Sequence, residues 1–232
     1  MSMMPYVSPE QLMKDKADYA RKGIARGRSV VSLTYADGLL LVAENPSRSL
    51  HKVSEIYDRI GFAAVGKYNE FESLRRQGIR LADVTGYQYA RSDVSGQTLA
   101  NAYANALGAA FTESSKPFEV ELLVGEVTPE GGIELFHILY DGSIAEQEGY
   151  VAIGGRAEAI NTHLAEGHDA SMDRDAALRL ARDAIAAGED NSPNAGSLEV
   201  AGLDRTRGRR KFFRLGPGTT RSVFGEDGAA AT

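Results

Sequence analysis

The side chains that most often catalyse reactions or bind metals are few in this sequence, and they are not grouped. The four histidines are His51, His137, His163 and His168, and none is spaced as a metal signature or as part of a catalytic triad. The chain has no cysteine, which excludes disulfides, thiolate zinc sites and a cysteine nucleophile. We therefore predict no metal site, no cofactor and no catalytic residue.

Two basic features could bind an anion. One is a cluster made of Arg205, Arg207, Arg209, Arg210 and Lys211. Because the net charge of the chain is −6, a solvated turn is the better interpretation of this cluster than a nucleic-acid patch. The other is Lys52, at the start of a predicted strand. Taken alone, it is most simply a solvated lysine at a strand end.

Length and composition predict one large domain. The chain has 232 residues, of which 43% are apolar, enough for a sizeable core. No stretch approaches the ~20 apolar residues of a membrane span. The first residues, MSMMPYVSPE, lack the apolar core of a signal peptide. We therefore expect a cytoplasmic protein that binds neither membrane nor nucleic acid.

The first element that could position a functional surface is a helix from Pro9 to about Arg26. Ser8 is a predicted N-cap, Pro9 suits the first helical position, and Gln11 is placed for a capping box. Apolar residues recur on one face of this helix, at Met13, Ala17, Ala20 and Ile24. This thin stripe of small residues predicts close packing, either on the chain's own sheets or on a neighbouring subunit.

The stretch Gly27–Glu44 predicts a hairpin at the centre of the fold. Residues 29–35 alternate with the period of a strand, and Ala36-Asp37-Gly38 supplies a turn. Residues 39–43 form a continuous apolar run, which is typical of a strand that is covered on both faces.

The remaining elements follow from the same rules. Further strands are expected at 51–57, 59–65, 118–127 and 133–140, around 144, and at 150–153, 197–203 and 210–215. Helices are expected at 67–89, from Asp93 or Ser95 to about 111, at 157–166, and at 172–187 with Ser171 as the cap. Residues 1–8 and 216–232 lack periodicity, so we predict a mobile N-terminal tail, a domain over 9–215 and a disordered C-terminal tail.

This order alternates helices with blocks of strands. Two sheets packed face to face, with helices outside each, would bury all the apolar faces. The pattern thus indicates an α+β fold with four αββα layers, although arrangements with one sheet remain open.

Several segments resemble the proteasome α subunit of the actinobacterial type. They are YVSPEQLM from Tyr6, ARKGIARG from Ala20, VAENPSRSLHKVSEIYDRIGFAAVGKYNEF from Val42, DVSGQTLANAYANALG from Asp93 and YDGSIAE from Tyr140. The similarity covers roughly residues 6–215. It implies the Ntn-hydrolase fold of proteasome subunits and heptameric rings that stack on rings of β subunits.

The resemblance also implies a division of labour. The α rings are non-catalytic: they gate the proteolytic chamber and dock ring-shaped activators through the activators' C-terminal tails. The implied activators are a hexameric AAA ATPase, which delivers proteins tagged with a ubiquitin-like modifier, and an ATP-independent ring. The alternative is an active N-terminal-nucleophile hydrolase matured by cleavage before Ser29. A third hypothesis is a free-standing protein-binding module that uses the first helix.

Site residues follow from matching positions. Arg28 stands where β subunits carry the nucleophilic threonine. Lys52 matches the family's pocket lysine, which receives the carboxylate of an activator tail, and Gly66 matches a glycine whose N–H faces that pocket. A lysine ammonium suits a terminal carboxylate.

The gate and the ring contact complete these expectations. The gating segment corresponds to Met1, Ser2, Met3, Met4, Pro5, Tyr6, Val7 and Ser8. The Tyr-Asp-Arg signature of archaeal and eukaryotic gates is missing, so the hydrogen bonding of those gates does not carry over. The ring interface is assigned to the stripe of Met13, Ala17, Ala20 and Ile24.

Overall fold

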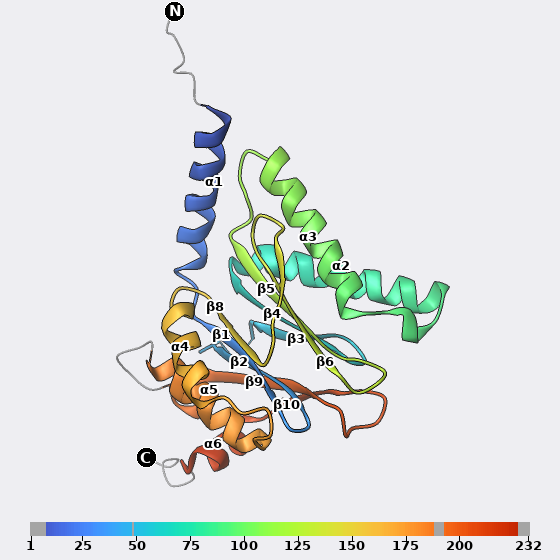
Figure 1. Cartoon of the computed structure of the whole chain (residues 1–232), viewed down its shortest axis with the longest axis vertical. Helices are drawn as coiled ribbons and strands as arrows, with labels where there is room; N and C mark the ends of the chain where they lie inside the picture. Colours follow the sequence, from blue (N-terminus) through green and yellow to red (C-terminus); the bar gives the residue numbers. More distant parts are fainter. Residues whose placement is uncertain (1–7, 48, 188–192, 227–232) are drawn as a thin grey trace, which may run out of the picture.

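Two antiparallel sheets face each other, with helices on their outer faces (Figure 1). The computed structural model describes residues 8–47, 49–187 and 193–226. The first sheet has the order β10-β9-β2-β1-β8 and the second the order β3-β4-β5-β6-β7. The expected α+β sandwich is therefore confirmed, and two sheets replace the single-sheet alternatives.

The strands of the first sheet are β1 (Val30–Tyr35), β2 (Gly38–Glu44), β8 (Tyr150–Ile153), β9 (Leu198–Asp204) and β10 (Phe212–Leu215). Those of the second are β3 (Val53–Tyr57), β4 (Ile60–Gly66), β5 (Val120–Val127), β6 (Ile133–Ile138) and β7 (Ile144–Glu146). The helices are α1 (Pro9–Ile24), α2 (Tyr68–Gln88), α3 (Gly96–Glu113), α4 (Ala157–Gly167), α5 (Arg174–Ala187) and α6 (Pro217–Phe224).

Three apolar clusters hold the layers together. One lies between the second sheet and α2 and α3, with Phe62, Leu74 and Leu107 among its members. A second lies between the two sheets and includes Leu41 and Leu123. The third joins the first sheet to α4 and α5. Each sheet thus buries both faces, which produces the four αββα layers (Figure 1).

The β1–β2 hairpin occupies the middle of the first sheet, as predicted. All seven residues of β2 are buried, in agreement with their continuous apolar run. β1 pairs with β2 from Val30↔Ala43 to Tyr35↔Gly38, and β9 and β8 flank the pair. The hairpin therefore runs from one end of the sandwich to the other.

The capping of α1 agrees with only part of the sequence prediction. Ser8 Oγ accepts a hydrogen bond from the backbone N–H of Gln11 at 3.2 Å, which confirms the N-cap. The predicted capping box is wrong, because the side-chain amide of Gln11 donates to Asp15 at 2.7 Å instead of returning to Ser8.

Two further predictions are corrected by the structure. The cap of α5 is Asp173, whose carboxylate accepts from the N–H of Ala176 at 2.7 Å, whereas Ser171 bonds to Asp169. The segment after residue 215 is not irregular throughout, since Pro217–Phe224 form α6. Pro217 suits the first turn of that helix, and Gly225 ends it with φ of +70°. The rest of the predicted tail, residues 227–232, lies outside the described residues.

Candidate functional site

The head of β1 carries a cluster of charged groups. Lys52 lies one residue before β3, and its ammonium donates to the backbone carbonyl of Arg28 at 2.7 Å. The Arg28 guanidinium is bound to the carboxylate of Glu44, the last residue of β2, which is only 4% exposed. The structure therefore brings the predicted Lys52 to Arg28, the position where the resemblance puts a nucleophile.

A buried carboxylate fixes the backbone of Lys52. Glu199 of β9 accepts from the N–H of Lys52 at 2.9 Å and from the side-chain amide of Asn45 at 2.8 Å. Arg214 donates to the same carboxylate at 2.5 Å. Burial would raise the pKa of Glu199, but the hydrogen bonds from Asn45, Lys52 and Arg214 outweigh it and hold the pKa below its ordinary value. Glu199 is thus a charged anchor between the two sheets.

Electrostatics make the Lys52 ammonium receptive to an anion. Burial lowers its pKa from 10.5 to about 8, and Arg28 adds to this effect, while Glu44 and Glu199 oppose it. A partly desolvated ammonium gains more from a carboxylate partner than an exposed one does, because the pair is less screened by water. The Lys52 ammonium is therefore a candidate partner for a carboxylate.

Gly66 lies close to Gly27, the residue before Arg28. It ends β4 with φ of +113°, and a Cβ there would come within 1.9 Å of the carbonyl oxygen of Glu119, so only glycine fits. A Cβ on Gly27 would lie 3.2 Å from the Gly66 nitrogen, which shows how closely these two backbones approach. Lys52 and Gly66 therefore both border the segment Gly27–Arg28.

The sequence reasoning missed two lysines beside Gly66. Lys67 and Lys116 both contact the Glu119 carboxylate, at 2.6 and 3.1 Å, and their side chains are 46% and 43% exposed. Lys67 directly follows Gly66, which is the only sequence signal that could have identified it. Lys116 also pairs with Glu70 at 2.6 Å, so the two ammonium groups are balanced by two carboxylates next to the predicted site.

Ser29, the nucleophile of the alternative hypothesis, is buried. Its side chain is 4% exposed and it lies inside the chain, directly before β1. Cleavage before Ser29 would remove α1, of which Ala20 and Ile24 belong to the core between the sheets. The packing of α1 therefore argues against a mature form that begins at Ser29.

The same packing corrects the predicted ring-interface stripe. Ala20 and Ile24 are 0% and 3% exposed within their own chain, so their side chains cannot contact a neighbour. Met13 and Ala17 are half-buried. The stripe packs mainly on its own sandwich, one of the two possibilities that the sequence left open.

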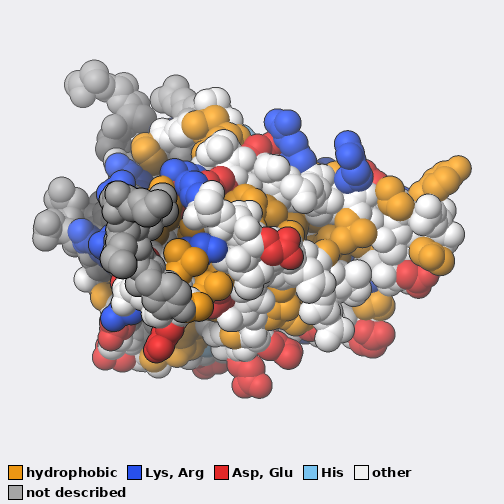
Figure 2. All heavy atoms as spheres, turned by 90° about the horizontal axis from the view of Figure 1, so that it is seen from above, with side chains coloured by type: hydrophobic (Ala, Val, Ile, Leu, Met, Phe, Trp, Pro, Cys, Tyr) orange, Lys and Arg blue, Asp and Glu red, His pale blue; other side chains and the backbone are white. Residues whose placement is uncertain are grey.

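Two other apolar side chains of α1 are exposed beside residues 115–117, the segment that follows α3. Leu12 and Tyr19 are 47% and 48% exposed. Figure 2 views the molecule from the end that carries α1 and shows hydrophobic side chains on this face. Lys16 lies between Leu12 and Tyr19 on the same face of α1, and its ammonium donates to the carbonyls of Phe111 and Ser114, at 2.9 and 2.8 Å, so that it joins α1 to the end of α3.

The predicted gate falls mostly outside the described residues. Met1 to Val7 are not described, and Ser8 is the N-cap of α1. In Figure 1, α1 projects from the sandwich, and the N-terminal end of this helix points away from the sheets.

Three of the four histidines have structural contacts. His51 Nδ1 lies 3.0 Å from Glu199, His137 Nε2 lies 3.6 Å from Glu121, and His168 Nε2 donates to the carbonyl of Thr34 at 3.1 Å. Among the described residues, no group of three or more His, Asp or Glu side chains could hold a metal ion.

The basic cluster is an exposed turn, as predicted. Arg209 lies 3.5 Å from Asp58, and Arg210 lies 2.5 Å from Glu55. These contacts join the β9–β10 turn to the second sheet, which the sequence did not indicate. No helix in the described part of the chain is long and apolar enough to cross a membrane.

Comparison with known proteins agrees with this geometry. Residues 24–202 match the family described as "Proteasome subunit". A "Proteasome subunit alpha" of Acidothermus cellulolyticus is 58% identical over 222 residues, which cover 93% of this chain and 94% of the relative. Proteins of the same name from Parafrankia sp. and Nocardioides sp. are 57% and 54% identical, over 90% and 99% of this chain and 90% and 92% of their own lengths. With a buried Ser29 inside the chain and Arg28 at the head of β1, this chain belongs to the proteasome subunit family and most resembles its non-catalytic alpha type.

Proposed function

We propose that this protein is the non-catalytic α subunit of a 20S proteasome core, in which seven copies form each outer ring on a ring of β subunits. One observation carries the proposal. The head of β1, where the family's active subunits have a free N-terminal nucleophile, is an internal Arg28 behind a helix that packs into the core. The chain therefore lacks the free α-amine that such catalysis needs.

Co-expression with a β subunit tests this function. Imaging of the particle should show rings of seven copies, and the intact mass of this chain should retain residues 1–28. A mass that begins at Ser29 would support the alternative hydrolase and overturn the proposal. A monomer that never forms rings would support the free-standing binding module.

The ring contact is now proposed for the exposed groove between α1 and residues 115–117, which Leu12 and Tyr19 line. Leu12 and Tyr19 are exposed apolar side chains on a helix that Lys16 fixes in place. Tyr19→Glu should break rings into smaller species while the domain keeps its melting temperature. Ala20→Glu is the contrasting variant: a carboxylate in a side-chain position that is 0% exposed should unfold the domain. If Tyr19→Glu still forms intact sevenfold rings, this surface of α1 does not lie at the ring interface.

Residues Met1–Ser8 are proposed as the gate of the chamber. The support is that they precede a capped helix and carry no core pattern. Deleting residues 1–8 should raise peptide hydrolysis by the assembled particle and create none in isolated α rings. Unchanged turnover would count against gating.

Activator docking is proposed for the surface beside Gly27–Arg28 that Lys52 and Gly66 border. The partners would be a hexameric AAA ATPase and an ATP-independent ring, each inserting a C-terminal carboxylate near the Lys52 ammonium. In the cytoplasm, the ATPase would deliver proteins that carry a ubiquitin-like tag. The low pKa of Lys52 supports a site that is completed by an incoming anion. Binding of a tail peptide to particles that carry Lys52→Ala tests this docking.

A further inference from the structure

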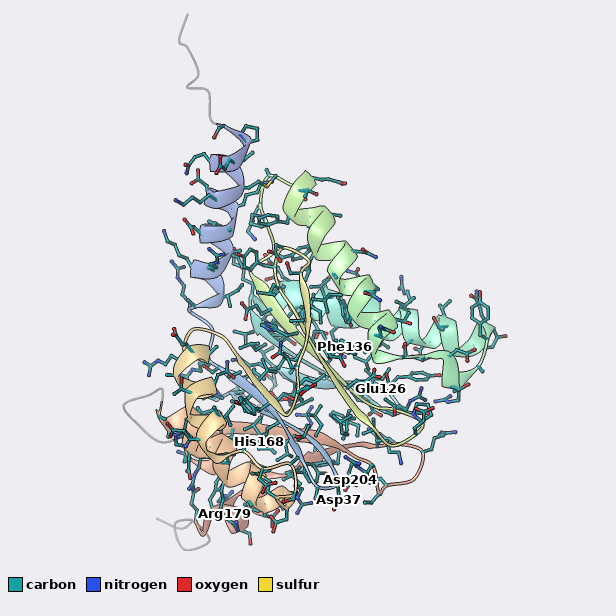
Figure 3. The ribbon with its side chains drawn as sticks, viewed as in Figure 1. Asp37, Glu126, Phe136, His168, Arg179 and Asp204 are labelled. Carbon is teal, nitrogen blue, oxygen red and sulfur yellow. The ribbon has the colours of Figure 1, made fainter. Side chains whose placement is uncertain are left out.

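A charged pocket lies at the end of the first sheet that is opposite to Lys52. It has a volume of about 340 Å³. Its lining residues are Tyr35, Asp37, Asp173, Arg174, Asp175 and Asp204. They come from the end of β1, the β1–β2 turn, the start of α5 and the end of β9. Figure 3 shows Asp37 and Asp204 next to each other at this end of the sheet.

The carboxylates outnumber their cations. Arg174 pairs with Asp175 at 3.0 Å. Asp173 accepts from a backbone N–H at the start of α5, and one oxygen of Asp204 accepts from the N–H and hydroxyl of Thr206 at 2.8 and 2.6 Å. Among the described residues, no ion pair reaches Asp37, Asp173 or Asp204. The pocket therefore has negative charge that its own side chains leave uncompensated.

A tyrosine with a buried hydroxyl lines the same pocket. Tyr35 is 3% exposed, and its Oη has no hydrogen-bond partner within the described structure. Burial and the carboxylates of Asp204 and Asp37 raise its pKa, while Arg174 and Arg205 oppose this, so the hydroxyl stays protonated at neutral pH. Leaving such a group without a partner costs about 1–3 kcal/mol. A ligand that hydrogen-bonds to Tyr35 would recover this cost.

We propose that this pocket binds a primary ammonium group. An ammonium has one positive charge and three N–H donors. The carboxylates of Asp37 and Asp204 are charged acceptors for two of them, and the Tyr35 oxygen can accept the third. A directly ligated metal ion is a poorer fit, because no metal-binding group of side chains occurs among the described residues.

This site is independent of the proposed docking surface. Arg28 and Tyr35 are seven residues apart along an extended chain, and at ~3.4 Å per residue they are separated by about 24 Å. The ammonium could belong to a free amine or to a lysine side chain of another polypeptide. Both present the same three donors, so a free amine and a lysine side chain are each tested with a probe of their own.

Calorimetric titration of the full chain at low salt tests the proposal. n-Butylammonium should bind saturably, and tetramethylammonium, which has the same charge but no N–H donor, should bind at least tenfold more weakly. Asp37→Asn and Asp204→Asn should each weaken n-butylammonium binding at least fivefold, and Tyr35→Phe at least threefold. Asp83→Asn removes the same charge from an exposed position on α2 and is the matched control, with affinity within twofold of wild type.

Two further probes identify the source of the ammonium. Tighter binding of 1,4-diaminobutane than of N-acetyl-lysine-N-methylamide would indicate a free amine, and the reverse order a lysine side chain; both support ammonium recognition. Four results would overturn the proposal: no saturable binding, equal affinity for tetramethylammonium, an equal loss with Asp83→Asn, or no loss with Tyr35→Phe.

Discussion

Raising the pH from 7 to 9 should weaken the binding of an activator-tail peptide about tenfold, because the Lys52 ammonium loses its proton in this range. With a pKa of about 8, the side chain is about 90% charged at pH 7 and about 10% charged at pH 9. Only the charged form attracts a carboxylate, so affinity follows the charged fraction. A tenfold change corresponds to about 1.4 kcal/mol of binding free energy.

The sign of this effect follows from the desolvation of Lys52. Burial disfavours the ammonium, which lowers its pKa from the ordinary 10.5 into the range of the experiment. A bound carboxylate favours the ammonium and raises the pKa again. Binding near pH 8.5 should therefore take up protons, and the binding enthalpy should depend on the ionisation enthalpy of the buffer.

The assay is fluorescence anisotropy of a labelled tail peptide with assembled particles at constant salt. At pH 7, Lys52→Ala should weaken binding by about 1–3 kcal/mol, the range for a charged hydrogen bond, and its affinity should not change between pH 7 and 9. Lys52→Arg should rescue part of the affinity, and its binding should also be independent of pH because arginine stays charged. Ring assembly and basal peptide hydrolysis should be unchanged in both variants.

A control variant distinguishes the loss of the Lys52 ammonium from the loss of any one positive charge. Lys22→Ala removes an exposed lysine from α1 and should keep the pH dependence of wild type. Our reasoning is refuted if the wild type binds equally well at pH 7 and 9, or if Lys52→Ala retains the same pH dependence. Equal affinity of wild type and Lys52→Ala at pH 7 would mean that the Lys52 ammonium takes no part in docking.

Three substitutions test what holds the fold together. Glu126→Ala should cost about 3–5 kcal/mol in urea denaturation, because Arg59, now 2.9 Å from this buried carboxylate, would lose its partner; a loss below 1 kcal/mol would contradict the burial of this pair. Gly78→Ala should cost about 1–3 kcal/mol, since the new Cβ would lie 1.7 Å from the hydroxyl oxygen of Tyr103, and Tyr103→Phe in the same chain should restore part of the loss. Lys16→Met should speed amide hydrogen exchange in α1 and leave the sheets protected, because the carbonyls at the end of α3 would lose their ammonium donor; equal exchange in α1 would show that this contact does not hold the helix.

The sequence predicted those elements that have strong local signals. The continuous apolar run of β2 correctly indicated a strand covered on both faces. α6 was missed because its composition of Gly, Thr, Ser and Arg lacks an apolar period, although Pro217 and Gly225 are proper start and stop signals. The side on which α1 packs was left open, because a stripe of small residues suits a sheet and a neighbouring subunit equally well.

The candidate site could be predicted only in part, because its contacts join residues that lie far apart in the sequence. Lys52 and Gly66 were identified by resemblance to a family, which gives positions but no contacts. Glu199, which holds the Lys52 backbone, is 147 residues away along the chain, and no local pattern connects the two. The Tyr35 pocket likewise requires the ends of β1 and β9 and the start of α5 to meet, and this follows from the topology.

The ammonium of Lys16 has a consequence for the kinetics of association. By holding the middle of α1 against α3, it orders the helix before any partner arrives. The backbone entropy lost in this ordering, about 1–2 kcal/mol per residue, is then part of folding and does not reduce the affinity between subunits. A neighbour that docks on Leu12 and Tyr19 meets a rigid surface, so the encounter can proceed as a rigid-body collision without a slow coupled folding step.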